Sequence, residues 1–210
     1  RGWAVADVDY RGSTGYGRSY MNALDGQWGV IDVADCVAAA RFLVAADQVD
    51  VNRIAIKGGS AGGLTVLAAL SGYDDFSAGS CRYGVADLEI LANDTHKFES
   101  RYLDRLIGPY PEDREVYVAR SPIHQTENFQ NPMIILQGSE DAVVPPNQSE
   151  LIVQALKTKG IRHSYLLFEG EGHGFRKSEN IVKALESEYS FFSQIFGFEP
   201  FDDIESTLIV

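Results

Sequence analysis

The sequence predicts an α/β fold in which a mostly parallel sheet carries helices on both faces. Short apolar runs alternate with longer segments whose apolar residues recur every three or four positions, which indicates strands alternating with helices. The predicted strands 132–137 and 163–168 contain the continuous apolar runs Met133–Leu136 and Tyr165–Phe168, as expected for strands buried on both sides. Parallel strands need long crossover connections, and helices usually provide them, so this alternation favours a parallel sheet.

The predicted elements follow one another along most of the chain. Residues 3–9 form an apolar run that predicts a strand, and a loop rich in glycine and tyrosine follows over 10–29. Val30, Val33 and Val37 recur at helical spacing and predict a helix over 30–46. Further strands are expected at 53–57, 79–86, 132–137 and 163–168, and further helices at 61–71, 146–158 and 178–196.

The last predicted helix has a candidate start and one apolar face. Ser178 is a plausible N-cap, because its hydroxyl can accept a hydrogen bond from a free N–H of the first turn. The apolar face is expected to carry Ile181, Leu185, Tyr189, Phe192 and Phe196. The stretch 88–128 is less regular, contains several prolines, and is the candidate for a cap-like insert.

Length and composition indicate one globular domain. A chain of 210 residues is long enough to bury a sizeable core. The formal net charge of −12 disfavours nucleic acid or an anionic membrane as the main partner, and no apolar stretch is long enough to span a membrane. Cys36 and Cys81 both lie in apolar settings and are expected to be free thiols.

The chain begins at Arg1 and enters an apolar run almost at once. Natural chain ends are more often polar and loose. We therefore expect residues 1–210 to be a partial domain that begins at a core strand, with the N-terminal strands of the sheet missing.

The strongest functional signal is the glycine-rich run Gly58–Gly63, which lies between the predicted strand 53–57 and the predicted helix 61–71. Its first five residues read Gly-x-Ser-x-Gly, the nucleophile-elbow pattern, which places Ser60 in a sharp turn with its hydroxyl outward. A helix that starts just after Ser60 directs free N–H groups and a positive dipole at the group under attack. The pattern alone also fits a plain strand-to-helix turn, so downstream partners must decide between the two.

A serine nucleophile needs a nearby base. In parallel α/β sheets reactive groups gather where the strands end, at the carboxyl edge. His173 lies in a glycine-rich loop just after the strand that ends at Phe168. The other histidines lie in the irregular stretch or at the start of a strand, which makes them weaker candidates; they are His96, His124 and His163.

The base in turn needs an acid to orient it. Asp141 directly follows a predicted strand, next to Glu140, which has the same charge. Asp87 also follows a predicted strand and is the main rival, with helix capping as its alternative role. Ser60, Asp141 and His173 occur in the order expected for α/β-hydrolases.

These motifs resemble the catalytic domain of the prolyl oligopeptidase family of serine peptidases, and its acylaminoacyl-peptidase and dipeptidyl-peptidase-like members are the most similar. The resemblance extends over nearly the whole chain. The matching residues are Arg11–Gly17, Trp28-Gly29 with Asp32, Gly58–Gly63, Gln137–Pro145 and Gly172–Phe175.

The resemblance implies an α/β-hydrolase fold and a serine-peptidase mechanism. Ser60 would attack the scissile carbonyl, His173 would transfer the proton, and Asp141 would orient the imidazole. The backbone N–H of Ala61 would be one oxyanion donor. The family's second donor is a tyrosine hydroxyl from a loop that would precede Arg1, as would the first strands and an N-terminal β-propeller.

Phe98 and Tyr102 are weak candidates for substrate binding. They are four residues apart on a predicted helical turn, where similar peptidases place aromatic walls for the residue before the cleaved bond. Two aromatic rings that merely pack under an insert are an equal alternative. No metal and no cofactor is expected, because histidines and cysteines do not cluster at ligand spacing and no dinucleotide pattern follows the first strand.

The sequence therefore predicts a serine peptidase that hydrolyses short peptides through an acyl-enzyme. A carboxylesterase on the same core is the alternative, because such a triad attacks esters and amides alike. A non-enzymatic scaffold would be expected to lack part of the triad, and all three residue types are present.

Overall fold

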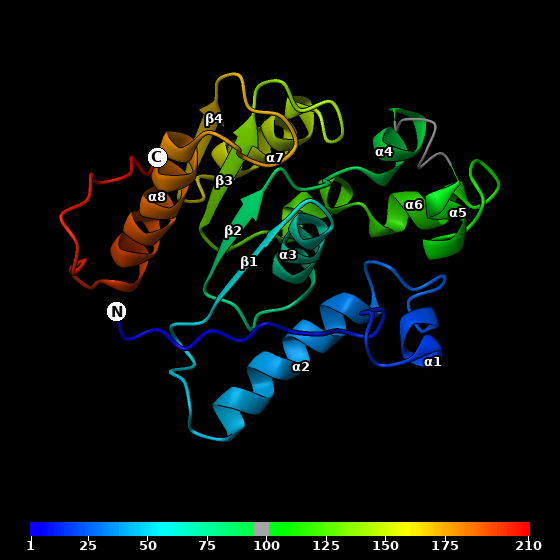
Figure 1. The fold of residues 1–210 in the computed structure, drawn as a ribbon, viewed down its shortest axis with the longest axis horizontal. Coiled ribbons are helices and arrows are strands. Elements are labelled where there is room, and N and C mark those ends of the chain that lie inside the picture. Colours follow the sequence, from blue (N-terminus) through cyan, green and yellow to red (C-terminus); the bar gives the residue numbers. More distant parts are fainter. Residues whose placement is uncertain (95–100) are drawn as a thin grey trace.

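The structure, a computed structural model, describes residues 1–94 and 101–210 and has a four-stranded sheet at its centre (Figure 1). The strands lie in the order β1-β2-β3-β4, and every neighbouring pair is parallel. All carboxyl ends therefore lie at one edge of the sheet, and the prediction of a parallel sheet is confirmed. The strands are β1 (Ala55–Gly59), β2 (Ala78–Arg82), β3 (Met133–Gly138) and β4 (His163–Phe168).

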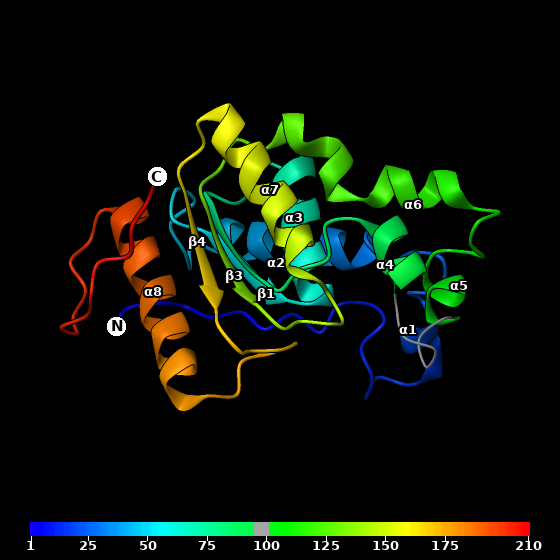
Figure 2. The same ribbon diagram turned by 90° about the horizontal axis from the view of Figure 1, so that it is seen from above.

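Helices cover both faces of the sheet, as Figure 2 shows. On one face Val66 and Ile135 belong to a core that the sheet shares with α2, α3 and α7. On the other face Leu136 packs in a second core with Phe191 of α8. Burial on both faces explains the apolar run Met133–Leu136 in β3, every residue of which is buried. These helices are α2 (Ile31–Ala45), α3 (Ala61–Gly72), α7 (Pro146–Lys159) and α8 (Ser178–Phe196).

A third apolar core lies to one side of the sheet, among short helices and the loops between them (Figure 1). Trp28 joins this core from the loop after α1, and Tyr117 is fully buried within it. The short helices on this side are α1 (Arg18–Asn22), α4 (Leu88–Asp94), α5 (Tyr102–Leu106) and α6 (Arg114–Arg120). The 3₁₀ segment η1 (Pro122–Asn128) instead packs against the first core through Ile123.

Strand β2 is shorter than the predicted strand 79–86, because it ends at Arg82. Tyr83 has a φ of 38°, which is outside the extended region and turns the chain out of the sheet. Gly84 then passes so close to Gly63 that a Cβ on Gly63 would lie 2.4 Å from the Gly84 Cα. The turn at the end of β2 thus packs directly on the start of α3.

The predicted strand at 3–9 is wrong, because this segment pairs with no strand in the described part of the chain. It runs beside β1 without hydrogen-bonding to it, and β1 is the edge of the described sheet. A cavity of about 890 Å³ lies between the two. The apolar sequence was read correctly as extended, but a strand forms only where a neighbour satisfies its backbone groups. The cavity is lined by residues that include Trp3, Val5, Val8, Ile54, Ile56 and Phe192.

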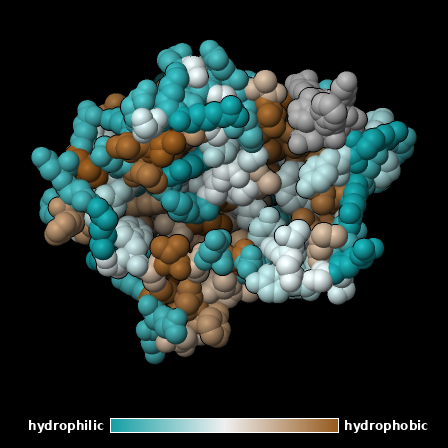
Figure 3. All heavy atoms as spheres, in the orientation of Figure 1, coloured by the Kyte–Doolittle hydropathy of each residue, from teal (hydrophilic) through white to brown (hydrophobic). Residues whose placement is uncertain are grey.

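The predicted apolar face of α8 is only partly correct. Phe192 is buried, but Ile181 is 40% exposed and Leu185 is 49% exposed. Figure 3 shows hydrophobic atoms at the surface on the side of the molecule that carries α8 and the N-terminal segment. Ser178 is not the N-cap, because it is the first residue of the helix and makes no capping hydrogen bond.

A buried carboxylate joins α8 to the sheet. Glu188 accepts hydrogen bonds from Ser80 Oγ at 2.6 Å and from the Arg82 guanidinium at 3.0 Å, and it also pairs with Lys57. A charge this deeply buried is tolerated only when it is fully paired. Glu188 therefore fixes how α8 sits on β1 and β2.

Both cysteines are free thiols, as predicted. Burial raises the pKa of Cys36 to about 11 and that of Cys81 to about 12, so neither forms a reactive thiolate at neutral pH. Among the described residues, no helix combines the length and apolar character needed to cross a bilayer.

Candidate active site

Ser60 occupies a strained turn between β1 and α3. Its φ of 55° and ψ of −118° are sparsely populated by residues with a side chain. The Ser60 N–H donates to the carbonyl of Arg82 at 3.0 Å, which anchors the turn to the end of β2. Strain of this kind is found at functional sites, where the surrounding structure holds it in place.

Three of the glycines around Ser60 are needed for close packing. A Cβ on Gly58 would lie 2.4 Å from the Gly62 carbonyl oxygen, and one on Gly59 would lie 2.9 Å from the Tyr83 ring. A Cβ on Gly63 would collide with Gly84 across the gap to β2. At Gly62 a Cβ would meet nothing within 4 Å.

These contacts predict opposite outcomes for two neighbouring substitutions in the full-length protein. Gly63→Ala should destabilise the fold by about 1–3 kcal/mol, because backbone must move to admit the methyl group. Gly62→Ala should be neutral or stabilising by up to about 1 kcal/mol, because alanine favours the helix. Chemical denaturation of both variants checks this, and equal stability of the two would contradict the predicted backbone clash.

His173 lies between Ser60 and Asp141. Its Nε2 is 2.8 Å from Ser60 Oγ, and its Nδ1 is 2.9 Å from Asp141 Oδ2. An ionised carboxylate can only accept, so Nδ1 carries the hydrogen in the neutral imidazole and Nε2 is free to accept from the serine hydroxyl. The structure thus brings together the three side chains that the sequence singled out, in a continuous hydrogen-bonded path.

Asp141 is held rigidly in the turn after β3. Its Oδ1 accepts hydrogen bonds from the backbone N–H groups of Val143 and Val144, both at 2.9 Å. The Gln137 amide lies 3.3 Å from the other oxygen, Oδ2. The carboxyl is buried, so these donors replace the water that would otherwise solvate it.

Tyr83 supports the imidazole from the side of β2. Its ring centroid lies 5.0 Å from that of His173 in an edge-to-face arrangement, and 5.4 Å from that of Phe175. Sequence reasoning missed Tyr83, which was read as part of a longer strand. The Gly84 that follows it was the available signal, since glycine often marks a turn at the end of a strand.

Ala61 is the first residue of α3, next to Ser60. The N–H groups of a helix's first turn have no partner within the helix, so the Ala61 N–H is of the kind that can bind an anion. The role of this group as an oxyanion donor remains a prediction from the sequence.

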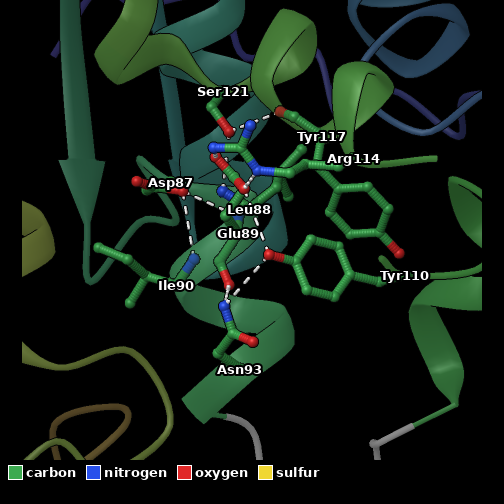
Figure 4. A network of polar contacts seen from close by, with 9 residues as sticks. All are labelled: Asp87, Leu88, Glu89, Ile90, Asn93, Tyr110, Arg114, Tyr117 and Ser121. Carbon is green, nitrogen blue, oxygen red and sulfur yellow. Dashed lines mark hydrogen bonds and ion pairs between the residues drawn. The ribbon is translucent and has the colours of Figure 1, made fainter. Parts of the chain in front are cut away.

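Asp87, the rival acid, instead caps a helix (Figure 4). Its Oδ1 accepts hydrogen bonds from the backbone N–H groups of Glu89 at 2.8 Å and Ile90 at 3.2 Å, at the start of α4. Glu89 pairs with Arg114 at 2.6 Å. Asp87, Glu89 and His124 have ligand atoms within 4.8 Å of one another, but the guanidinium beside Glu89 disfavours a cation there.

Of the remaining candidates, His163 and Tyr102 lie in the part of the chain that the structure describes. His163 is at the start of β4, the opposite edge of the sheet, with Nδ1 2.7 Å from the Ile161 carbonyl. Tyr102 is 60% exposed at the start of α5. Phe98 and His96 lie outside the described residues.

Asp32, which belongs to the matching motif, is buried and braces the elbow. It accepts hydrogen bonds from the Gly29 N–H and from Thr65 Oγ1 of α3, both at 2.7 Å. Burial nevertheless raises the pKa of Asp32 above its ordinary value. Arg120 donates to the carbonyls of Trp28 and Gly26, so the same loop is held from both sides.

Comparison with known proteins agrees with this architecture. The sequence matches the prolyl oligopeptidase family over residues 1–199. A solved puromycin-hydrolyzing peptidase of Mycobacterium tuberculosis has a TM-score of 0.94 and 48% identity, over 97% of this chain and 31% of that chain. Dipeptidyl aminopeptidase BIII of Pseudoxanthomonas mexicana is 32% identical over 86% of this chain and 27% of that protein. An acylaminoacyl peptidase of Pyrococcus horikoshii has a TM-score of 0.79 and 26% identity, over 93% of this chain and 32% of that chain.

The parallel sheet, the helices on both faces and these structural neighbours define an α/β-hydrolase fold. Within that class, the chain belongs to the prolyl oligopeptidase family of serine peptidases. It spans less than a third of the length of each of the three relatives named above.

Proposed function

We propose that the protein is a serine peptidase that hydrolyses short peptides, with Ser60 as nucleophile, His173 as general base and acid, and Asp141 as the orienting acid. The observation that carries this proposal is the hydrogen-bonded path from Ser60 Oγ through the imidazole to the buried carboxylate, at 2.8 and 2.9 Å. A serine hydroxyl is a weak nucleophile unless such a base removes its proton.

The reaction follows from this geometry in two halves. Ser60 Oγ bonds to the scissile carbonyl carbon while its proton passes to His173 Nε2. The imidazolium, stabilised by Asp141, then protonates the leaving amine as the C–N bond breaks, which leaves an acyl-enzyme. In the second half, water attacks the ester carbonyl, gives its proton to His173, and releases the acid with regeneration of the Ser60 hydroxyl.

The oxyanion formed in each half needs hydrogen-bond donors. The Ala61 N–H is one of them in this proposal, because it follows the nucleophile directly at the start of α3. Loss of one such donor usually costs about 3–4 kcal/mol of transition-state stabilisation. A second donor, the family's tyrosine hydroxyl, would come from outside residues 1–210.

The names of the relatives support peptide substrates. They describe a peptidase that hydrolyses puromycin, a dipeptidyl aminopeptidase and an acylaminoacyl peptidase. A carboxylesterase would use the same three residues, so substrate choice must be measured. We expect the full-length protein to cleave chromogenic peptide anilides, with kcat/KM for the best anilide above that for short acyl esters. Ester cleavage with no peptide turnover would reverse the assignment.

We also propose that residues 1–210 are a partial catalytic domain, in which the stretch 88–128 is a cap-like insert. Two observations favour a missing strand: β1 is the edge of the described sheet, and the cavity of about 890 Å³ separates it from the extended segment 3–9. In the α/β-hydrolase strand order an earlier strand would lie between them. The N-terminal strands and a β-propeller of the parent chain are the partners that this arrangement implies.

This proposal predicts that residues 1–210, expressed alone, are poorly stable and at best weakly active. In the fragment, apolar side chains that line the cavity remain exposed to water. Each Å² of apolar surface that is not buried lowers the free energy of unfolding by roughly 25 cal/mol. Thermal melts and peptidase assays on the fragment and on the full-length protein check it. A cooperative transition together with full activity from the fragment would show that no further strand is needed.

A further inference from the structure

The loop that carries His173 contains a buried acid that the proposed mechanism does not use. Glu171 lies two residues before His173, between β4 and α8, and is only 2% exposed. Glu169, in the same loop, is exposed. A glutamate is almost never fully buried unless its carboxylate is paired or hydrogen-bonded, so the partners of Glu171 matter.

The Glu171 carboxylate ties the two ends of this loop together. Oε2 accepts a hydrogen bond from the backbone N–H of Arg176 at 2.9 Å. Oε1 accepts one from the backbone N–H of Lys177 at 2.9 Å and one from the Asn180 side-chain amide at 2.8 Å. The Asn180 hydrogen bond, with the two backbone donors, lowers the pKa of Glu171, so the carboxylate is ionised at neutral pH.

The backbone of the same segment is fastened to the turn that holds Asp141. The Glu171 carbonyl accepts from the Glu140 N–H at 2.9 Å, and the Gly170 N–H donates to Ser139 Oγ at 2.9 Å. A Cβ on Gly138 would lie 2.4 Å from the Glu171 carbonyl oxygen, so the two backbone segments are packed too closely to admit a side chain at residue 138. Glu171 thus connects the start of α8 with the turn after β3, and His173 lies between these two attachments.

We propose that Glu171 is a positioning residue for His173: its buried carboxylate, held by Arg176, Lys177 and Asn180, fixes the loop 169–177 so that the imidazole stays within hydrogen-bond reach of both Ser60 and Asp141. The inference rests on the proposed function, because it assigns the loop's rigidity to proton transfer. It adds a requirement for catalysis beyond the three triad residues, namely that the Glu171 carboxylate holds the loop 169–177 in place.

The test is Glu171→Gln in the full-length protein, compared with Glu169→Gln as a matched control. Glutamine has the same shape, but its NH₂ group cannot accept, so at least one hydrogen bond is lost and a donor faces a donor. We expect kcat to fall about 10- to 100-fold with KM changed less than about twofold, because a displacement near 1 Å costs about that much. Glu169→Gln should stay within about twofold of wild type in both constants.

A second variant covers the case in which Glu171→Gln does not fold. Asn180→Ala removes one donor to the carboxylate and leaves the other two, so kcat should fall in the same direction but less. The double variant should be no slower than Glu171→Gln alone, because residues that act as one unit are not additive. Unchanged kcat in a folded Glu171→Gln, equal losses in Glu169→Gln and Glu171→Gln, or unchanged kcat in Asn180→Ala when Glu171→Gln is unfolded would each overturn the proposal.

A crystal structure of the folded variant separates this proposal from the proposed function. If Glu171 positions His173, the distance from Nε2 to Ser60 Oγ must lengthen beyond hydrogen-bond range, whatever the substrate. An unmoved imidazole overturns the positioning role. Failure of the proposed function looks different, because the wild type would then turn over no peptide or Ser60→Ala would match it.

Discussion

Replacing Ser60 by alanine in the full-length protein is expected to lower kcat for peptide hydrolysis by about 10⁴- to 10⁶-fold, the range seen when a serine nucleophile is removed. The described contact of the hydroxyl is with His173, at 2.8 Å, and alanine has no atom that can attack or donate there. The fold should be retained, because alanine and serine share the Cβ that already occupies the strained turn with φ of 55°.

The measurement is steady-state hydrolysis of a peptide anilide, with circular dichroism to establish that the variant is folded. Ser206→Ala is the matched control: it makes the same chemical change at an exposed position far along the chain from the elbow. It should leave kcat unchanged. Activity of Ser60→Ala within tenfold of wild type would remove Ser60 from its proposed role.

Asp141→Asn should be nearly as damaging, with a loss of about 10⁴-fold in kcat. The reason is the tautomer. The asparagine oxygen would take over the hydrogen bonds from Val143 and Val144, which turns its NH₂ group toward His173 Nδ1. Nδ1 would then have to accept, the proton would move to Nε2, and the imidazole could no longer take the Ser60 proton. The fold should survive, because the turn keeps its acceptor.

Asp87→Asn is the discriminating companion, because both acids follow a strand. Asparagine caps a helix as well as aspartate does, so the hydrogen bonds to Glu89 and Ile90 should persist. We expect activity within about threefold of wild type. A large loss in Asp87→Asn combined with a small loss in Asp141→Asn would exchange the roles of the two residues.

The sequence predicted correctly those strands and helices whose local pattern of apolar residues fits only one kind of secondary structure. The runs Met133–Leu136 and Tyr165–Phe168 predicted strands, and β3 and β4 form there; β3 is buried along its whole length. The segment 3–9 has the same kind of pattern, but no strand lies beside it in the described chain. Pairing depends on a neighbour, which a single-segment pattern cannot reveal.

The candidate site likewise contains residues that the sequence could identify and residues that only the tertiary structure reveals. Ser60, Asp141 and His173 could be named because each follows a strand of a parallel sheet, where side chains converge. Glu171 could not be told from Glu169, since both are acids in one glycine-rich loop and only the tertiary fold buries one of them. Ser178 failed as a cap because α8 begins one residue earlier than the sequence suggested: Lys177 is the N-cap, and its carbonyl accepts from the N–H groups of Asn180 and Ile181.

The order of the strands makes the contact between Ser60 and His173 depend on the geometry of the whole described sheet. Ser60 follows β1 and His173 follows β4, so the two are carried by opposite margins of the described sheet, roughly 14 Å apart at the usual strand spacing. Only the excursion of residues 169–177 closes that distance to a hydrogen bond. A small change in sheet twist would therefore change the distance between Ser60 Oγ and His173 Nε2. We expect kcat to fall at distortions of the sheet that are too small to unfold the helices.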